Sequence, residues 1–212
     1  MAIEKTLFTG ADLDTRRTEV YNWLTANATE YFSEITIDDN KQIVCTIANG
    51  GSVVFGYGSS SSYQYNGIIT LANGTSYKSN SSTSTLSYKH TYAVKMDNGI
   101  YLYAYSSYNT SYNGCVLISK TNDGAVVISA LLSSNGSILC PEKDVIYQID
   151  KDLKAVRTEN TVFCPIVIGE NSYTENMLYM PFKQQVTFIG TMTDAEGQKY
   201  WYDGTCALKY EE

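Results

Sequence analysis

The alternation of apolar and polar positions is clearest between residues 100 and 132. In residues 100–105, apolar Ile, Leu and Ala alternate with three tyrosines, which is the two-residue period of a β-strand. Residues 115–121 and 125–132 are rich in Val and Ile, and the tight-turn signal Asn122-Asp123-Gly124 lies between them. This region predicts the middle of an antiparallel sheet, with an aliphatic inner face and a second face lined by tyrosine.

A helical period appears near the N-terminus. Between residues 14 and 32 the apolar side chains recur at spacings of three and four, at Val20, Trp23, Leu24, Ala28 and Tyr31. Asp14 or Thr15 can serve as the N-cap. The pattern predicts a helix over residues 14–32 that packs on the β domain, preceded by an irregular arm over residues 1–13.

From residue 33 onward, short strands alternate with turn residues. The pattern predicts strands at residues 42–47, 52–57, 67–71, 85–88, 92–96, 145–149, 161–168, 186–192, 198–202 and 206–210. Pro165 restricts its strand to a sheet edge or a bend. A single helix cannot supply the crossovers that parallel strands need. The predicted fold is therefore all-β, an antiparallel β-sandwich or open barrel that forms one domain over residues 33–212. Its core is predicted to include Val20, Leu24, Val44, Val54, Leu102, Ile118, Val126, Ile128, Ile146, Phe188 and Leu208.

The net charge and the length of the apolar runs indicate whether nucleic acid or a membrane is an expected partner of this chain. The formal net charge is −7 and Lys and Arg form no cluster, so a nucleic-acid partner is not expected. The apolar runs are too short to span a bilayer, and the first residues lack the apolar stretch of a secretory signal. We therefore expect no membrane insertion and synthesis in a reducing cytoplasm, where the 5 scattered cysteines act as small apolar residues.

Residue chemistry gives no strong catalytic or metal motif. His90 is the single histidine, and neither a nucleophile motif nor a Cys/His cluster accompanies it. The acidic pairs at residues 38/39, 150/152 and 194/196 read as turn residues without the spacing of a calcium loop. We predict no catalytic residue, no metal and no cofactor. A glycoside-acting enzyme stays open as an alternative, because two of the many acids could converge across a cleft.

Tyrosine is unusually abundant, with 19 Tyr against 2 Trp, and it is concentrated among Ser, Asn and Gly in residues 56–113. This mixture is typical of adaptable binding surfaces, because tyrosine offers a large amphipathic contact at low entropic cost. The predicted interaction surface consists of Tyr57, Tyr63, Tyr65, Tyr101, Tyr103, Tyr105, Tyr108 and Tyr112. The alternative is that a second sheet covers the tyrosine stripe and that the loops are solvated spacers.

The C-terminal residues 176–212 carry a hairpin-like pattern formed by Gly197, Lys199, Tyr200, Gly204, Ala207 and Leu208. This pattern resembles the ending of small structural proteins of tailed bacteriophages and prophages of Gram-positive gut bacteria, and the opening MAIEKTLFTGAD is similar in style. The resemblance implies a non-enzymatic virion component of the tail, baseplate or head surface. Such a protein, made in the bacterial host cytoplasm, would contact other virion proteins, with homo-oligomerisation in the assembly. The alternative function is a β-sandwich module for host attachment, whose loops bind a host glycan or surface protein.

Overall fold

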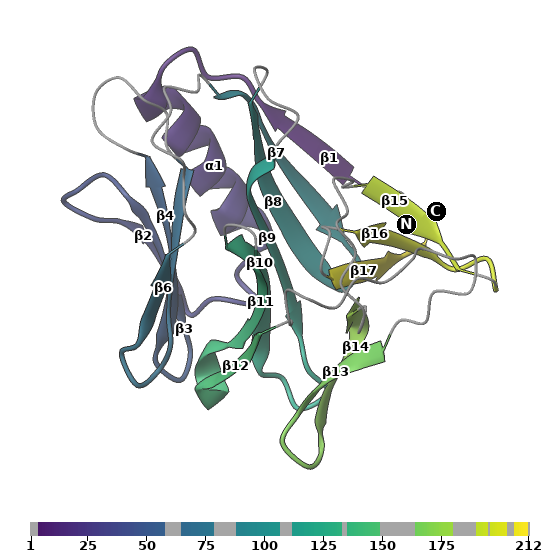
Figure 1. Ribbon diagram of the computed structural model, residues 1–212. Helices are drawn as coiled ribbons and strands as arrows, with labels where there is room; N and C mark the ends of the chain where they lie inside the picture. Colours follow the sequence, from purple (N-terminus) through teal and green to yellow (C-terminus); the bar gives the residue numbers. More distant parts are fainter. Residues whose placement is uncertain are drawn as a thin grey trace.

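The computed structural model describes residues 4–57, 65–78, 88–106, 112–132, 135–148, 164–179, 190–194, 196–202 and 206–211. Within these ranges the chain forms three antiparallel sheets and one α-helix near the N-terminus (Figure 1). The predicted all-β fold with one N-terminal helix is therefore confirmed. None of the described residues belongs to a helix long and apolar enough to cross a bilayer.

The sheets lie in three layers. The central sheet has the order β1 (Glu4–Phe8), β7 (Tyr88–Met96), β8 (Gly99–Ser106), β9 (Tyr112–Lys120), β10 (Val126–Leu132), β11 (Asn135–Cys140) and β12 (Val145–Gln148). The N-terminal sheet has the order β2 (Glu34–Ile37), β3 (Ile43–Ile47), β4 (Gly51–Tyr57), β5 (Tyr65–Thr70) and β6 (Ser76–Lys78). The C-terminal sheet has the order β13 (Cys164–Ile168), β14 (Ser172–Tyr179), β17 (Cys206–Tyr210), β16 (Lys199–Tyr202) and β15 (Gly190–Thr193). Figure 1 shows the N-terminal sheet and α1 on one side of the central sheet and the C-terminal sheet on the other.

Both faces of the central sheet are buried, which follows from the alternation along β8. Ile100 and Leu102 pack in a cluster with α1 and the N-terminal sheet, whereas Tyr101 packs in a second cluster with the C-terminal sheet. The first cluster contains Val20, Leu24, Ile43, Cys45, Val53, Phe55, Ile118 and Ile128, and the second contains Val94, Leu117, Val127, Ile166, Met177 and Leu208. The predicted aliphatic inner face is thus one of two apolar faces, which makes the central sheet the middle layer of the sandwich.

The helix and the N-terminal arm differ from their predicted bounds. Helix α1 (Leu13–Asn27) begins after Asp12, whose Oδ1 accepts a hydrogen bond from the Thr15 amide at 2.7 Å, so the N-cap is neither Asp14 nor Thr15. Its last residue is Asn27 rather than residue 32. Tyr31 and Phe32 follow after a turn, and their buried side chains continue the apolar spacing although the backbone is no longer helical. The prediction of an irregular arm is wrong for residues 4–8, which pair with β7 while the Phe8 ring enters the core.

Most of the predicted core is confirmed, with one reversal. Val20, Leu24, Leu102, Ile118, Val126, Ile128 and Leu208 are buried, Ile146 is half-buried against the first cluster, and Phe188 lies outside the described residues. Val44 and Val54 are only half-buried, because Ile43, Cys45, Val53 and Phe55 occupy the inner face of their strands. Since β3 and β4 are apolar on both faces, alternation alone could not select the inner one. The predicted edge position of the Pro165 strand is confirmed, since β13 is an edge strand with an irregular register between Pro165 and Val167.

Candidate functional site

Several of the predicted tyrosines lie at the limits of the described parts of their strands. The pair Tyr57↔Tyr65 closes the described part of the β4–β5 ladder, and the pair Tyr105↔Tyr112 lies at the corresponding limit of the β8–β9 ladder. Strand β7 begins at Tyr88, which pairs with Ser106 beside that second limit. In two sheets, the last described pair of a ladder is therefore a pair of tyrosines.

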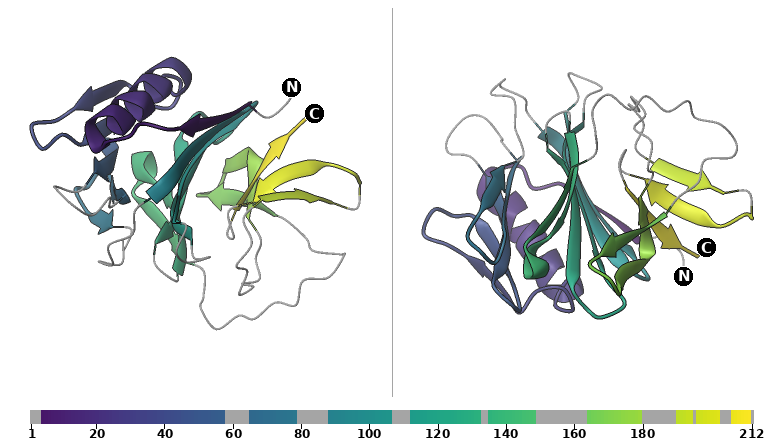
Figure 2. Two further views of the ribbon diagram at one scale, coloured as in Figure 1. Left: turned by 90° about the horizontal axis from the view of Figure 1, so that it is seen from above. Right: turned by 60° about the horizontal axis from the view of Figure 1, so that its bottom comes forward.

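These strand ends lie at one end of the molecule. The opposite end of the β4–β5 ladder is fixed by Pro141, whose carbonyl accepts a hydrogen bond from the Ala72 amide at 3.1 Å. Pro141 directly follows β11, and the antiparallel registers from β11 through β10 and β9 to β8 place Tyr105 and Tyr112 at the far end from Pro141. Figure 1 and the right view of Figure 2 show the ends of these strands on one side of the molecule. We call the set Tyr57, Tyr65, Tyr88, Tyr105 and Tyr112 the tyrosine end.

The structure thus divides the predicted interaction surface. It brings the backbones of Tyr57, Tyr65, Tyr105 and Tyr112 to one end, while Tyr63 and Tyr108 lie outside the described residues. Tyr103 pairs with Tyr92 and Cys115 within the sheet. For Tyr101 the prediction is wrong, because its side chain is fully buried and packs against Trp201 with ring centroids 5.5 Å apart. The C-terminal sheet covers this part of the tyrosine stripe, as the alternative interpretation expected.

The opposite end of the strands is held together by polar side chains of turns. Asn122 lies in the β9–β10 turn. Its backbone amide donates to the Tyr173 carbonyl, and its side-chain Oδ1 accepts from the Tyr173 backbone amide, both at 2.8 Å. Its Nδ2 also donates to the Asn171 carbonyl at 3.2 Å. A backbone bridge between Thr121 and Thr174 continues the contact. The turn therefore joins the central sheet to the C-terminal sheet.

Asp123 is the centre of a second group of contacts in the same turn. Its Oδ2 accepts from Lys143 Nζ and from Ser172 Oγ, both at 2.5 Å, and its Oδ1 accepts from Thr121 Oγ1 at 2.5 Å. Lys143 Nζ also donates to Ser172 Oγ. The hydrogen bond from Lys143, followed by those from Ser172 and Thr121, holds the pKa of the Asp123 carboxyl well below its ordinary value of 3.8.

Ser172 lies beside Lys143, and some hydrolytic enzymes use such a lysine to activate a serine nucleophile. The Lys143 ammonium is ion-paired with Asp123, and in that state it has no electron pair with which to accept the Ser172 proton. The Ser172 hydroxyl itself donates to the carboxylate, and the residue is only 5% exposed. The arrangement therefore suits a structural clamp better than an activated nucleophile.

The N-terminal sheet is connected to the same region. The short 3₁₀ helix η1 (Pro141–Lys143) is followed by Asp144, whose Oδ1 accepts from the Asn73 amide at 2.8 Å. Gly51 lies so close to Pro141 that a Cβ at residue 51 would approach the proline Cβ to 2.4 Å. Residues 71–75, 121–124, 141–144 and 169–174 thus link all three sheets, and we call them the clamped end. Sequence reasoning recognised Asn122-Asp123-Gly124 as a turn but missed its partners, which are distant in the chain.

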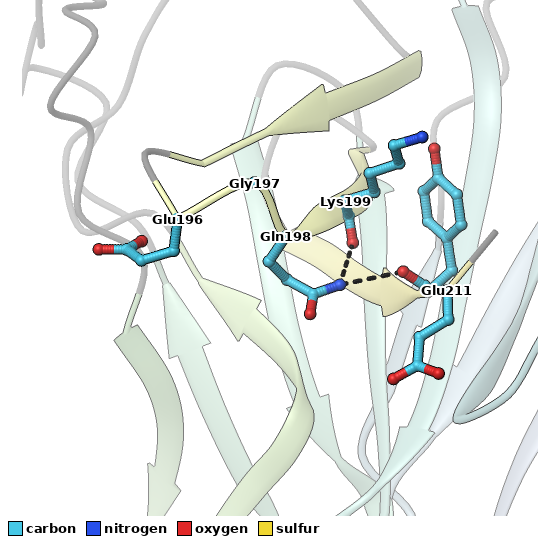
Figure 3. A pocket seen from close by; sticks show the side chains of 6 residues that line it. Glu196, Gly197, Gln198, Lys199 and Glu211 are labelled. Carbon is cyan, nitrogen blue, oxygen red and sulfur yellow. Dashed lines mark hydrogen bonds between the residues drawn. The ribbon is translucent and has the colours of Figure 1, made fainter.

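A shallow hollow of about 400 Å³ lies at the β16 and β17 strand ends, lined by Glu196, Gly197, Gln198, Lys199, Tyr210 and Glu211 (Figure 3). Gln198 Nε2 donates to the Lys199 carbonyl at 3.1 Å and to the Tyr210 carbonyl at 3.0 Å. Figure 3 shows the carboxylates of Glu196 and Glu211 on different sides of Gln198 rather than converging. The two described acids of this hollow are therefore not placed to act together on one substrate.

Acidic turns elsewhere use their oxygens within the protein. Asp38 Oδ1 accepts the Gln42 amide at 2.8 Å, and Asp194 Oδ1 accepts the amides of Glu196 and Gln198. Among the described residues, no three His, Cys, Asp or Glu side chains gather as metal ligands would. Asp150 and Asp152, and the side chain of His90, lie outside what the structure describes.

Comparison with known proteins returned no match among family models, curated proteins or solved structures. The described residues of the C-terminal pattern lie on the last hairpin or in the turn before it. Lys199 and Tyr200 belong to β16, Ala207 and Leu208 belong to β17, and these strands pair in register from Lys199↔Tyr210 to Tyr202↔Ala207. Gly197, with a φ of +86°, occupies the turn before β16, and Gly204 lies outside the described residues.

Proposed function

We propose that this protein is a non-enzymatic assembly component that binds other proteins through its tyrosine end. The observation that carries the proposal is the convergence of Tyr57, Tyr65, Tyr105 and Tyr112, from two different sheets, on one end of the strands. A single hairpin ending in tyrosine would be unremarkable, because tyrosine is a good strand residue. Two such hairpins at the same end form a common surface on a rigid scaffold.

The chemistry of this end suits contact with another surface. Ser, Asn and Gly surround the tyrosines in the sequence, and only 17% of all residues are charged. A surface selected only for solubility would carry more Lys and Glu. Tyrosine is enriched where proteins meet, because its ring buries a large area and its hydroxyl still forms a hydrogen bond.

The phage-like C-terminal hairpin suggests the setting of this assembly. On that basis we propose that the partners are other virion proteins and that the chain is one structural component of the virion, repeated within it. Attachment to a host glycan or surface protein would use the same tyrosines. It differs in one respect, because a recognition module binds its ligand outside the assembled particle.

The test replaces Tyr63, Tyr65, Tyr108 and Tyr112 together by Ser. We expect an unchanged melting temperature and the loss of association with the virion proteins encoded beside this chain, measured by co-assembly and pull-down. Tyr173→Ser is the matched control, because Tyr173 is 43% exposed at the clamped end. The control should keep both properties. If the variant with four Ser substitutions keeps its association with these proteins, the proposal is contradicted. If it loses only the binding of a host glycan, host attachment is favoured.

A further inference from the structure

The outer face of the N-terminal sheet carries an aliphatic row across its three middle strands. Val44 on β3, Val54 on β4 and Ile68 on β5 are in register as Val44↔Val54 and Val54↔Ile68. All three are half-buried, whereas the residues next to them in the chain, such as Cys45 and Val53, point into the core. Figure 1 shows this sheet as an outermost layer of the molecule, so the row faces away from the protein.

A row of hydroxyl residues runs beside the aliphatic row, formed by Thr46, Ser52, Thr70 and Ser76 in register on β3 to β6. Thr70 Oγ1 and Ser76 Oγ are hydrogen-bonded at 2.9 Å. Charges occur only at the flanks of the two rows. Glu34 on β2 ends the hydroxyl row at one edge, and Lys78 on β6 ends the aliphatic row at the other. The face is therefore apolar in its middle and oppositely charged at its two edges.

The two rows are nearly symmetric about β4, which makes the face self-complementary. A two-fold axis parallel to β4 would place Val54 over Val54 of a second copy, Val44 over Ile68, and Thr46 over Thr70. The same rotation brings β2 of one copy over β6 of the other. Glu34 then lies one row from the oppositely charged Lys78, within the reach of long side chains.

We propose that two copies of this chain associate face to face through the outer face of the N-terminal sheet, with β4 on the two-fold axis. The strands of the two sheets would then run in nearly the same direction, which is the usual aligned packing of β-sheets. Because the axis is parallel to the strands, both tyrosine ends would point the same way. The dimer would present two such ends side by side and so raise the avidity for a repetitive partner. The dimer itself does not depend on the role of the tyrosines.

The first experiment compares Val54→Lys with Val167→Lys by sedimentation equilibrium from low to high micromolar concentration. Val167 is the matched control, because it is an exposed valine of the C-terminal sheet, with 55% of its surface accessible. We expect the unchanged protein and Val167→Lys to be dimers. A lysine on the axis would bury two like charges against each other, so Val54→Lys should associate at least about tenfold more weakly. A monomeric unchanged protein would overturn the proposal, and so would a dimer that Val54→Lys leaves intact.

The second experiment tests the axis and does not depend on a charged substitution folding. Facing sheets lie roughly 10 Å apart, so a short bismaleimide suits the test better than a direct disulfide. Val54→Cys should crosslink to itself, whereas Val44→Cys and Ile68→Cys should each crosslink weakly alone and strongly when mixed. The protein with its native cysteines sets the background. Self-crosslinking of Val44→Cys at the level of Val54→Cys would contradict this two-fold arrangement.

Charge exchange provides the last control. Glu34→Lys should weaken the dimer, and the double variant Glu34→Lys with Lys78→Glu should restore it. Failure of the double variant to restore association would show that the two edges do not face each other. The tyrosine variant with four Ser residues should remain dimeric, so the failure of either proposal can be recognised without the other.

Discussion

The two ends of this molecule have similar turn-rich sequences, but the structure describes dense polar contacts between sheets at the clamped end. At the clamped end, Asn122, Asp123 and Lys143 direct their side chains to neighbouring sheets and bond there. At the tyrosine end, the described parts of strands from two sheets reach tyrosines that lie among Ser, Asn and Gly in the sequence. Turn residues thus hold the layers together at the clamped end, whereas external contact is what we propose for the tyrosine end. Substitutions that remove the bonding side chains or the close packing of the clamped end should therefore change stability, and those of the tyrosines at the tyrosine end should change association.

The largest effect on stability is expected for Gly51→Ala. The new Cβ would lie 2.4 Å from Pro141 Cβ and 3.0 Å from the Thr70 carbonyl oxygen, so the N-terminal sheet and η1 must separate. Overpacking of this kind costs about 1–3 kcal/mol of unfolding free energy. Denaturant unfolding measures it, with the neighbouring Ser52→Ala as control. Equal stability of the two variants would show that the clamped end does not hold the N-terminal sheet.

Asn122→Ala should cost less, about 1 kcal/mol, because it removes one accepted and one donated hydrogen bond while the backbone contact to Tyr173 stays. Asn171→Ala is the matched control, since Asn171 takes part in this contact through its carbonyl. The measurement is again the unfolding free energy. Similar losses in both variants would mean that the Asn122 side chain does not join the two sheets.

Asp123→Asn should act mainly on the acid side of the stability profile. The pKa of Asp123 is lowered in the folded protein, so its contribution is complete above the ordinary value of 3.8 and is lost as pH falls through the lowered pKa. When the pH is lowered from neutral to about pH 3, the melting temperature of the unchanged protein should therefore decrease more than that of Asp123→Asn. Asp39→Asn, at an exposed turn residue, is the control and should follow the unchanged protein. An Asp123→Asn profile parallel to that of the unchanged protein would contradict the clamp.

The smallest effect concerns two residues with left-handed backbone, Lys41 with a φ of 60° and Asp144 with a φ of 54°. Lys41→Gly relieves the strain and loses only a surface pair with Asp14, so it should gain about 0.5 kcal/mol. Asp144→Gly also loses the bond to the Asn73 amide and should be nearly neutral. Thermal unfolding of both variants checks the difference. A clear gain for Asp144→Gly would show that its bond contributes little to the clamped end.

Local patterns predicted much of the fold because they depend on neighbouring residues. Alternation located β8, and the predicted turn Asn122-Asp123-Gly124 lies between β9 and β10, where Gly124 has a φ of +90°. The reversed face of Val44 and Val54 shows where this reasoning stops. Both faces of that sheet are apolar, and only the position of the other layers decides which one is inner.

Tertiary placement decided the rest of the candidate site. Alternation put Tyr101 on a tyrosine face, but whether that face met solvent or another sheet depended on residues 164–211, far along the chain. The clamp joins residues 123, 143 and 172, which no local spacing connects. The resemblance of the last hairpin identifies none of these contacts.

Because both faces of the central sheet are buried, an incomplete or truncated chain would leave one of them uncovered. One face packs against residues from the first third of the sequence, and the other packs against β17, more than a hundred residues further along the chain. A chain that ends before residue 164 would expose Val94, Leu117 and Val127 to water as part of a continuous apolar surface. Such a surface promotes aggregation. The three layers therefore depend on one another for stability, and we expect a shortened version of this protein to aggregate rather than to form a soluble fragment.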